Sequence, residues 1–179
     1  SGTLRIGHPV DVATGAVYST HSDITIHGRV PLLWDRRYCT AMLTMPSGPL
    51  GPGWTSRYFA TLTPSEDGFR FVTPEGDLEI FADREAIDRG DTVRNLSSFD
   101  ELHRQGDTYV VTRWNVIDGN VERYKFRKVF AADVWQLACI EDVTGDGLDL
   151  VYDAEGRLAT ITQRLERRTL LLEYSSATR

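Results

Sequence analysis

Near its end the chain runs Tyr152-Asp153-Ala154-Glu155-Gly156-Arg157-Leu158, followed by Ile161-Thr162 and then by Leu170-Leu171-Leu172-Glu173-Tyr174. Short apolar runs flank a Glu-Gly pair, and glycine readily adopts the positive φ that tight turns require. The stretch therefore predicts a strand, a tight turn, a second strand and a third. One hairpin cannot bury its own apolar face, so this one needs neighbouring strands.

Strand signals recur along most of the chain. Alternating residues share one face of a ribbon at Leu32, Trp34, Arg36 and Tyr38, and Pro31 lacks a ladder N–H, so this strand begins there or lies at an edge. Further strands are expected at Ile24–Ile26, Tyr58–Leu62, Phe69–Phe71, Leu78–Phe81, Tyr109–Trp114, Tyr124–Phe130, Trp135–Ile140 and Leu148–Tyr152. Roughly ten to twelve strands joined by Gly-containing turns indicate an antiparallel meander.

The charged segment between Phe81 and Asp107 is less regular. Ser98-Phe99-Asp100-Glu101 has the form of a capping box, which predicts a short helix near Phe99–His103 ended by Gly106. A second short helix is expected around Arg84–Asp88. The predicted fold class is all-β: an antiparallel meander that forms a curved sheet, with one or two short helices near 82–106.

Composition limits the classes of partner. The 179 residues carry a net charge of −6, so the basic face that nucleic acids require is not expected. No apolar run approaches the roughly 20 residues that span a bilayer, so no membrane segment is expected in this chain. Lys125 and Lys128 are the only lysines, which leaves 20 − 2 = 18 arginines. Arginine could tie strands together through bidentate contacts with carboxylates, although codon bias would also explain the excess.

Two loops rich in Gly or Pro, at 7–15 and 47–54, flank the strand that ends in Arg36-Arg37-Tyr38. In this order the motifs resemble the domain of unknown function that opens the core of RHS-repeat proteins, and the hairpin at Tyr152–Leu158 resembles a first tyrosine-aspartate (YD) repeat. The resemblance covers the chain from His8 onward. The residues that carry it are Pro9, Asp11, Thr14, Gly15, Arg37, Tyr38, Gly51, Pro52, Gly53, Trp54, Tyr152, Asp153, Gly156, Arg157 and Leu158.

The resemblance implies a structural role. RHS cores are long β-sheets coiled into a hollow shell that encloses a C-terminal toxin, and in type VI secretion effectors the opening domain follows a spike-tip (PAAR-like) domain. Residues 3–141 would then be the opening plug or cap domain, and residues 142–179 a first repeat hairpin. The implied partners are the spike-tip domain, the shell and the toxin of the same Rhs polypeptide, which is made in the bacterial cytoplasm and exported as a larger effector. No motif matches the family's self-cleaving protease-like element, so neither catalytic residues nor a cofactor are expected.

Several motifs allow other interpretations. From Asp142 to Asp153, carboxylates fall at positions one, five and twelve of a calcium-type loop, but Thr144 stands at position three and a turn with Asx-type hydrogen bonds fits equally. Cys39 and Cys139 are expected to be buried thiols, with a disulfide as the alternative. The four histidines lack zinc-site spacing and are expected at the surface; they are His8, His21, His27 and His103.

The four tryptophans raise the main alternative function, a carbohydrate-binding β-sandwich module. Such modules stack sugar rings on exposed aromatic side chains, whereas core packing is expected here for at least three of the four. An exposed, coplanar pair would favour sugar binding. A second alternative, a hydrolase or self-processing enzyme, requires a pocket in which a nucleophile contacts a histidine. The tryptophans are Trp34, Trp54, Trp114 and Trp135.

Overall fold

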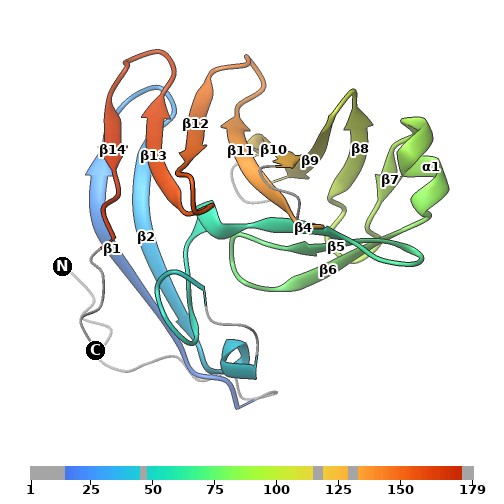
Figure 1. Cartoon of the computed structure of the whole chain (residues 1–179), viewed down its shortest axis with the longest axis horizontal. Helices are drawn as coiled ribbons and strands as arrows, with labels where there is room; N and C mark the ends of the chain where they lie inside the picture. Colours follow the sequence, from blue (N-terminus) through green and yellow to red (C-terminus); the bar gives the residue numbers. More distant parts are fainter. Residues whose placement is uncertain (1–14, 45–47, 115–118, 129–132, 175–179) are drawn as a thin grey trace.

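The computed structural model describes residues 15–44, 48–114, 119–128 and 133–174, and this part of the chain is almost entirely β-structure (Figure 1). Within these described residues, fourteen strands form two antiparallel sheets, accompanied by one short α-helix and two 3-10 turns. The predicted all-β antiparallel fold with a curved sheet is confirmed. Pro9, Asp11 and Thr14 of the family motif, together with His8 and Phe130, lie outside the described residues.

The smaller sheet has the order β1-β2-β3. Its strands are β1 (Tyr18–Ile26), β2 (Leu32–Cys39) and β3 (Trp54–Thr55). β1 and β2 form a long hairpin, and a bulge lies between Ser22 and Ile24. Pro31 immediately precedes β2, as its missing N–H predicted. A 3-10 turn, η1 (Thr40–Thr44), follows β2.

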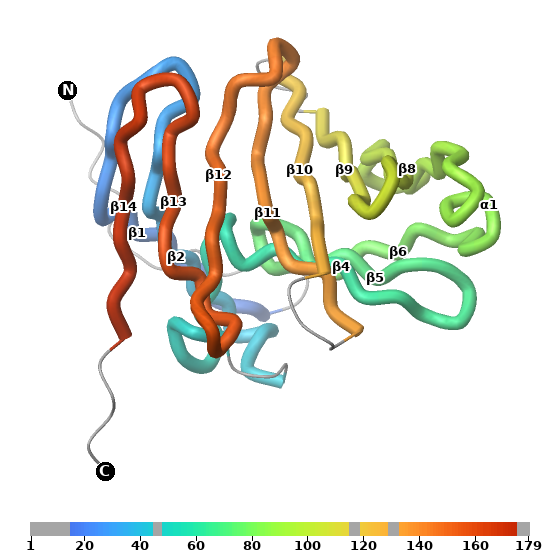
Figure 2. The backbone as a smooth tube through the Cα atoms, turned by 45° about the horizontal axis from the view of Figure 1, so that its top comes forward, coloured from blue at the N-terminus to red at the C-terminus, as the bar shows by residue number. Residues whose placement is uncertain are grey.

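The larger sheet runs in the order β14-β13-β12-β11-β10-β9-β8-β7, and β4, β5 and β6 join it through β11. Its strands are β4 (Thr61–Pro64), β5 (Gly68–Val72), β6 (Leu78–Ala82), β7 (Val93–Arg94), β8 (Glu101–Gln105), β9 (Thr108–Trp114), β10 (Val121–Lys128), β11 (Trp135–Glu141), β12 (Gly147–Tyr152), β13 (Leu158–Gln163) and β14 (Thr169–Leu171). One end of β11 pairs with β12 and the other with β4, so two arms of the sheet diverge from this strand. Figures 1 and 2 show the resulting curvature.

The core is formed mainly by aromatic and aliphatic side chains of the larger sheet. Phe69, Phe71, Phe81 and Phe126 have no exposed surface. Trp34 stacks on buried Tyr58, with ring centroids 5.8 Å apart, and Trp135 meets Tyr109 edge-on at 4.6 Å. Trp54 is half-buried against Tyr38, whereas Trp114 is 49% exposed. Among the described residues, the exposed coplanar pair of tryptophans that would favour a sugar-binding platform is not found.

One helix prediction is confirmed and the other is wrong. The α-helix α1 (Arg84–Arg89) is capped by Asp83, whose Oδ1 accepts a hydrogen bond from the Ala86 N–H at 2.9 Å. Residues 101–105 form β8 instead of a helix, because Leu102 is fully buried opposite Val111 of β9. The Ser98 hydroxyl donates to Glu79 Oε2 at 2.8 Å. Burial in the sheet therefore outweighed the local capping signal.

A smaller correction concerns the strand expected over Tyr58–Leu62. Residues Arg57–Phe59 form a 3-10 turn, η2, and strand pairing begins only at Thr61. The turn places Tyr58 in the core, where its hydroxyl accepts a hydrogen bond from the Leu33 N–H of β2 at 3.2 Å. Burial raises the pKa of Tyr58 to about 12. The turn thereby links the two sheets.

The two sheets are also joined where the β1–β2 turn meets the β13–β14 turn, which lie side by side in Figures 1 and 2. Gln163 is fully buried, and its side-chain amide donates to the carbonyls of Ile26, His27 and Val30 at 3.0–3.3 Å. Glu166 accepts from the Arg29 N–H at 2.7 Å. Segments more than a hundred residues apart are thus held together by side chains of the β13–β14 turn, among which Gln163 makes three of the contacts.

The same five-residue turn occurs three times in the described residues. In each copy the side-chain oxygen of the first residue accepts from the N–H groups two and four positions later; these first residues are Thr73, Asp142 and Asp153. The fourth residue of each is a glycine with positive φ, at Gly76 (+90°), Gly145 (+85°) and Gly156 (+79°). These contacts are local, so the turns form by themselves and set strand spacing.

The turn geometry confirms the Asx-type interpretation of Asp142. Its Oδ1 accepts from the Thr144 N–H at 2.8 Å and from the Asp146 N–H at 3.1 Å. Within the described part of the chain, no group of three His, Cys, Asp or Glu side chains could hold a metal ion. Asp142 Oδ1 therefore serves the backbone of its own turn, and Oδ2 lies 3.5 Å from Arg29 Nε.

Replacing Asp142 by alanine is expected to lower the free energy of unfolding by about 1 kcal/mol, because two turn N–H groups lose their acceptor. Chemical denaturation with and without EDTA would measure this. EDTA is expected to leave the melting temperature of the unmodified protein unchanged. Val143→Ala, at a side chain 60% exposed in the same turn, is the control and should change stability by less than about 0.5 kcal/mol. A calcium-dependent melting temperature would contradict the assignment.

Candidate functional site: a polar cleft between the two sheets

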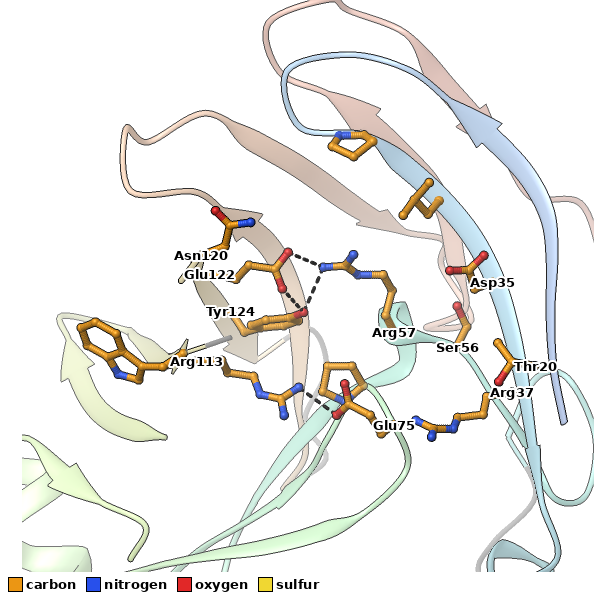
Figure 3. Close-up of a pocket in the computed structure, with 14 residues that line it drawn as sticks. Thr20, Asp35, Arg37, Ser56, Arg57, Glu75, Arg113, Asn120, Glu122 and Tyr124 are labelled. Carbon is orange, nitrogen blue, oxygen red and sulfur yellow. Dashed lines mark hydrogen bonds and ion pairs between the residues drawn. The ribbon is translucent and has the colours of Figure 1, made fainter. Parts of the chain in front are cut away.

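A cleft with a volume of about 920 Å³ lies between β2 of the smaller sheet and β9 and β10 of the larger one. We call it the inter-sheet cleft. It is lined by residues from β2, from η2 and the residue before it, from the turn after β5, and from β9 and β10. In Figure 3, Asn120, Glu122 and Tyr124 stand on one side, and Thr20, Asp35 and Arg37 on the other. Its walls are therefore far apart in sequence.

Arg57, at the start of η2, crosses the cleft toward β10 (Figure 3). Its Nη2 donates to Glu122 Oε1 at 2.7 Å and to Tyr124 Oη at 3.0 Å, and the Tyr124 hydroxyl donates to Glu122 Oε2 at 2.8 Å. Burial alone would lower the pKa of Arg57, but Tyr124 and Glu122 outweigh it and raise the pKa. Arg57 thus remains a fixed cation whose Nη2 is already engaged.

Arg113 of β9 lines the cleft and holds two carboxylates, of which Glu75 also lines the cleft. Its Nε donates to Asp100 Oδ2 at 2.8 Å and its Nη1 to Glu75 Oε2 at 2.9 Å. Burial tends to raise the pKa of Glu75, but the Arg113 charge and hydrogen bonds hold that pKa below its usual value. Asp100 is more deeply buried, with its side chain 4% exposed, and there burial raises the pKa despite Arg113. The guanidinium therefore pairs with one buried acid, Asp100, and with one half-buried acid, Glu75.

The β2 side of the cleft differs because its polar groups remain unsatisfied. Asp35 and Arg37 are two residues apart, which places them on the same face of the strand. Neither forms an ion pair with another described residue. Asp35 Oδ1, Arg37 Nε and Ser56 Oγ are buried and have no hydrogen-bond partner. This wall offers both donors and acceptors to a molecule in the cleft.

The structure brings some family-motif residues together. Tyr38 pairs with Trp54 across β2 and β3, and the Cys39 N–H donates to the Gly53 carbonyl at 2.9 Å. Gly53 has a φ of +76°, and a Cβ there would lie 2.7 Å from the Tyr38 ring, so this position requires glycine. Gly51 also has a positive φ, of +95°. Arg37 of the same strand lines the inter-sheet cleft.

The remaining motif residues lie elsewhere. Pro52 is exposed, and Gly15 begins the described residues with a φ of +72°. Tyr152, Asp153, Gly156, Arg157 and Leu158 belong to the β12–β13 hairpin and line no part of the cleft. Arg157 pairs with Asp153 at 2.8 Å and lies over the Tyr174 ring, 4.8 Å from its centroid. The motif therefore marks two separate structural regions.

Most cleft residues were not identified from the sequence. The missed residues are Asp35, Ser56, Arg57, Glu75, Arg113, Glu122 and Tyr124. One usable signal was the polar face of β2, where Asp35 and Arg37 alternate with Trp34 and Arg36. The acids and arginines of the other wall carry no motif, because they become neighbours only when the sheets pack.

The structure shows the surroundings of both cysteines and of three of the four histidines. Cys39 and Cys139 are both buried and free, so the disulfide alternative is wrong. Burial raises the pKa of the Cys139 thiol to about 12. His21 is exposed and meets Ser19 Oγ at 2.8 Å, but neither residue lines the inter-sheet cleft. His27 is exposed, whereas His103 is half-buried.

Comparisons with known proteins place only part of the chain. None of the helices in the described residues is long and apolar enough to cross a membrane. No curated protein matches the chain. Residues 7–81, which are less than half of the chain and end within β6, are similar to a domain of unknown function, DUF6531.

Proposed function

We propose that this chain is a structural segment near the start of a larger RHS-type β-shell, which encloses a C-terminal toxin and helps to deliver it in a bacterial secretion system. In this proposal the polypeptide is made in the cytoplasm and exported as part of a larger effector. Its partners are further strands of the same polypeptide, the toxin and a spike-tip domain. The observation that carries the proposal is a tyrosine–carbonyl hydrogen bond that occurs at β12 and again just after the edge strand β14.

The contact is made by two tyrosines 174 − 152 = 22 residues apart. The Tyr152 hydroxyl donates to the Leu137 carbonyl of β11 at 2.7 Å, and the Tyr174 hydroxyl donates to the Leu158 carbonyl of β13 at 2.9 Å. The leucines before each tyrosine match as well, since Leu150 is buried and Leu172 packs against the core. Each tyrosine hydroxyl thus reaches a leucine carbonyl of the preceding strand, so Tyr174 is the structural equivalent of Tyr152, 22 residues later.

The strand before Tyr174 has one free edge. Among the described residues β14 pairs only with β13, and Leu171 at its end is 62% exposed. β7 ends the other side of the sheet, and β6 and β1 also pair on one side only. Unpaired N–H and C=O groups at an edge favour the addition of further strands. This curved, unclosed sheet supports a role as one part of a longer β-surface.

The proposal predicts that an added repeat stabilises the protein. A copy of residues 153–174 inserted after Tyr174 would supply a turn and two strands in the same register. Because neighbouring repeats stabilise one another, we expect the free energy of unfolding to rise by at least about 1 kcal/mol. The melting temperature should rise by about 3 °C, measured by circular dichroism or calorimetry.

The control is an insertion of equal length and composition with the residue order scrambled, which should leave the melting temperature unchanged or lower it. Faster proteolysis of the scrambled insertion would confirm that it remains unpaired. Equal melting temperatures for the ordered and scrambled insertions would refute the idea that β14 awaits a neighbouring strand.

A further inference from the structure

The inter-sheet cleft contains an unusual concentration of unsatisfied polar atoms. Within the described residues, seven buried side-chain nitrogen or oxygen atoms have no hydrogen-bond partner, and four of them belong to residues that line this cleft. The four atoms are Asp35 Oδ1, Arg37 Nε, Ser56 Oγ and Arg57 Nε. Buried polar atoms are nearly always paired in folded proteins, so such a cluster indicates a missing partner.

Ser56 is the clearest member of the cluster. The residue is only 1% exposed, yet its hydroxyl neither donates to nor accepts from another group in the protein. In Figure 3 Ser56 is drawn on the same side of the cleft as Asp35 and β2. An unpaired buried hydroxyl destabilises the fold, and alanine would remove that cost. A ligand that enters the cleft would satisfy it.

The charged residues that line the cleft indicate the net charge of the ligand. Three arginines and three acids line it, so its formal charge is zero. Arg57 and Arg113 already pair with Glu122 and with Glu75 and Asp100, which leaves one cation, Arg37, and one anion, Asp35. A phosphate or another polyanion would meet as many acids as bases here. A neutral ligand is therefore favoured.

The geometry of the donors points in the same direction. Arg57 offers a single Nε–H, because its Nη2 is already directed to Glu122 and Tyr124. The Arg37 guanidinium lies two residues from the Asp35 carboxylate on the same face of β2, and this carboxylate would repel a carboxylate or phosphate that approached the guanidinium. Donors beside a carboxylate acceptor and a hydroxyl instead suit a molecule with several hydroxyl groups, each of which both donates and accepts.

The rim of the cleft adds an apolar surface. Trp114 lines it and is 49% exposed, so its ring can contact a ligand without rearrangement of the core. The volume of about 920 Å³ falls within the range of small-molecule sites. We propose that the inter-sheet cleft binds a neutral carbohydrate, which hydrogen-bonds to Asp35, Arg37 and Ser56 and packs a ring face on Trp114. This inference is independent of the role as a shell segment.

A glycan array of neutral oligosaccharides, followed by calorimetric titration of the best ligand into the 179-residue protein, tests the proposal. Asp35→Asn and Trp114→Ala are each expected to weaken binding about tenfold or more. Ser56→Ala is expected to raise the melting temperature of the unliganded protein while it weakens binding. This opposite response distinguishes a binding group from a structural one.

Two substitutions outside the cleft serve as controls. Phe99→Ala removes another aromatic side chain, 60% exposed, and Asp133→Asn changes a side chain 89% exposed; both should bind sugar normally. The proposal is overturned if no neutral glycan binds at millimolar concentration, or if Asp35→Asn and Trp114→Ala leave binding intact. Displacement of the glycan by inorganic phosphate would show an anion site and would also overturn it.

Discussion

Replacement of Arg113 by alanine is expected to lower the free energy of unfolding by about 3 kcal/mol. The substitution leaves two carboxylates without their cation, and one of them, Asp100, has a side chain only 4% exposed. It also removes a guanidinium that lies 5.9 Å from the ring centroids of Phe71 and Tyr124. Urea denaturation at neutral pH would measure the loss.

The loss should depend on pH. Burial already raises the pKa of Asp100 and Arg113 opposes that rise, so without Arg113 the Asp100 carboxylate destabilises the fold more strongly at pH values above its folded pKa. As the pH falls through that pKa the group becomes protonated, and the difference from the unmodified protein should shrink toward about pH 4. A difference that stays constant with pH would show that lost packing, and not unpaired charge, is responsible.

Arg89→Ala provides the matched control for Arg113. Arg89 pairs with Asp91 at 3.0 Å, but their side chains are 62% and 59% exposed. Exposed ion pairs contribute less than about 1 kcal/mol, so this variant should unfold almost like the unmodified protein. A loss as large as that of Arg113→Ala would contradict the special role of the buried pair.

Replacement of Gln163 by leucine is expected to lower the free energy of unfolding by about 2 kcal/mol. The side-chain amide of Gln163 is the donor to three carbonyls of the β1–β2 turn, and leucine would remove this donor from all three. The carbonyls of Ile26 and Val30 belong to half-buried residues, whereas the His27 carbonyl keeps a hydrogen bond from Arg168. We also expect faster amide hydrogen exchange in β1 and β2 than in β10 and β11, because the hairpin loses its connection to β13 while the larger sheet keeps its pairing.

The control is Gln105→Leu, at an exposed glutamine that ends β8, which should change neither stability nor exchange appreciably. If Gln163→Leu destabilises the protein but exchange in β1 and β2 stays as slow as before, the hairpin is held by other contacts. Those contacts include the Glu166 carboxylate on the Arg29 N–H, which lies in the same pair of turns.

Features made by neighbouring residues could be predicted from the sequence. The turns at Thr73, Asp142 and Asp153 depend on side-chain oxygens and glycines within five residues, and α1 depends on Asp83 and Gly90 at its two ends. The period-two pattern predicted most strands for the same reason, because it reflects the pleat of a single ribbon. These elements, and with them the all-β class, follow from local chemistry.

The failure at β8 shows where local chemistry is overruled. Ser98 and Glu101 have the spacing of a capping box, but Leu102 gains more by burial against Val111 than a single cap supplies. The partner strand β9 lies close in the chain, yet nothing within residues 98–103 reveals that it will pair there. A sequence window therefore predicted the wrong element.

The inter-sheet cleft was decided by tertiary structure alone. Arg57 and Glu122 are 65 residues apart, and Arg113 and Glu75 are 38 apart, so their ion pairs exist only after the sheets have packed. The sequence by itself determined strands, turns and the excess of arginine. The distances between the two walls of the inter-sheet cleft decide which charges cancel one another and which polar atoms stay unsatisfied beside Ser56. No local sequence pattern encodes these distances. Electrostatic and hydrogen-bond energies fall off steeply with distance, so they are settled by the three-dimensional packing.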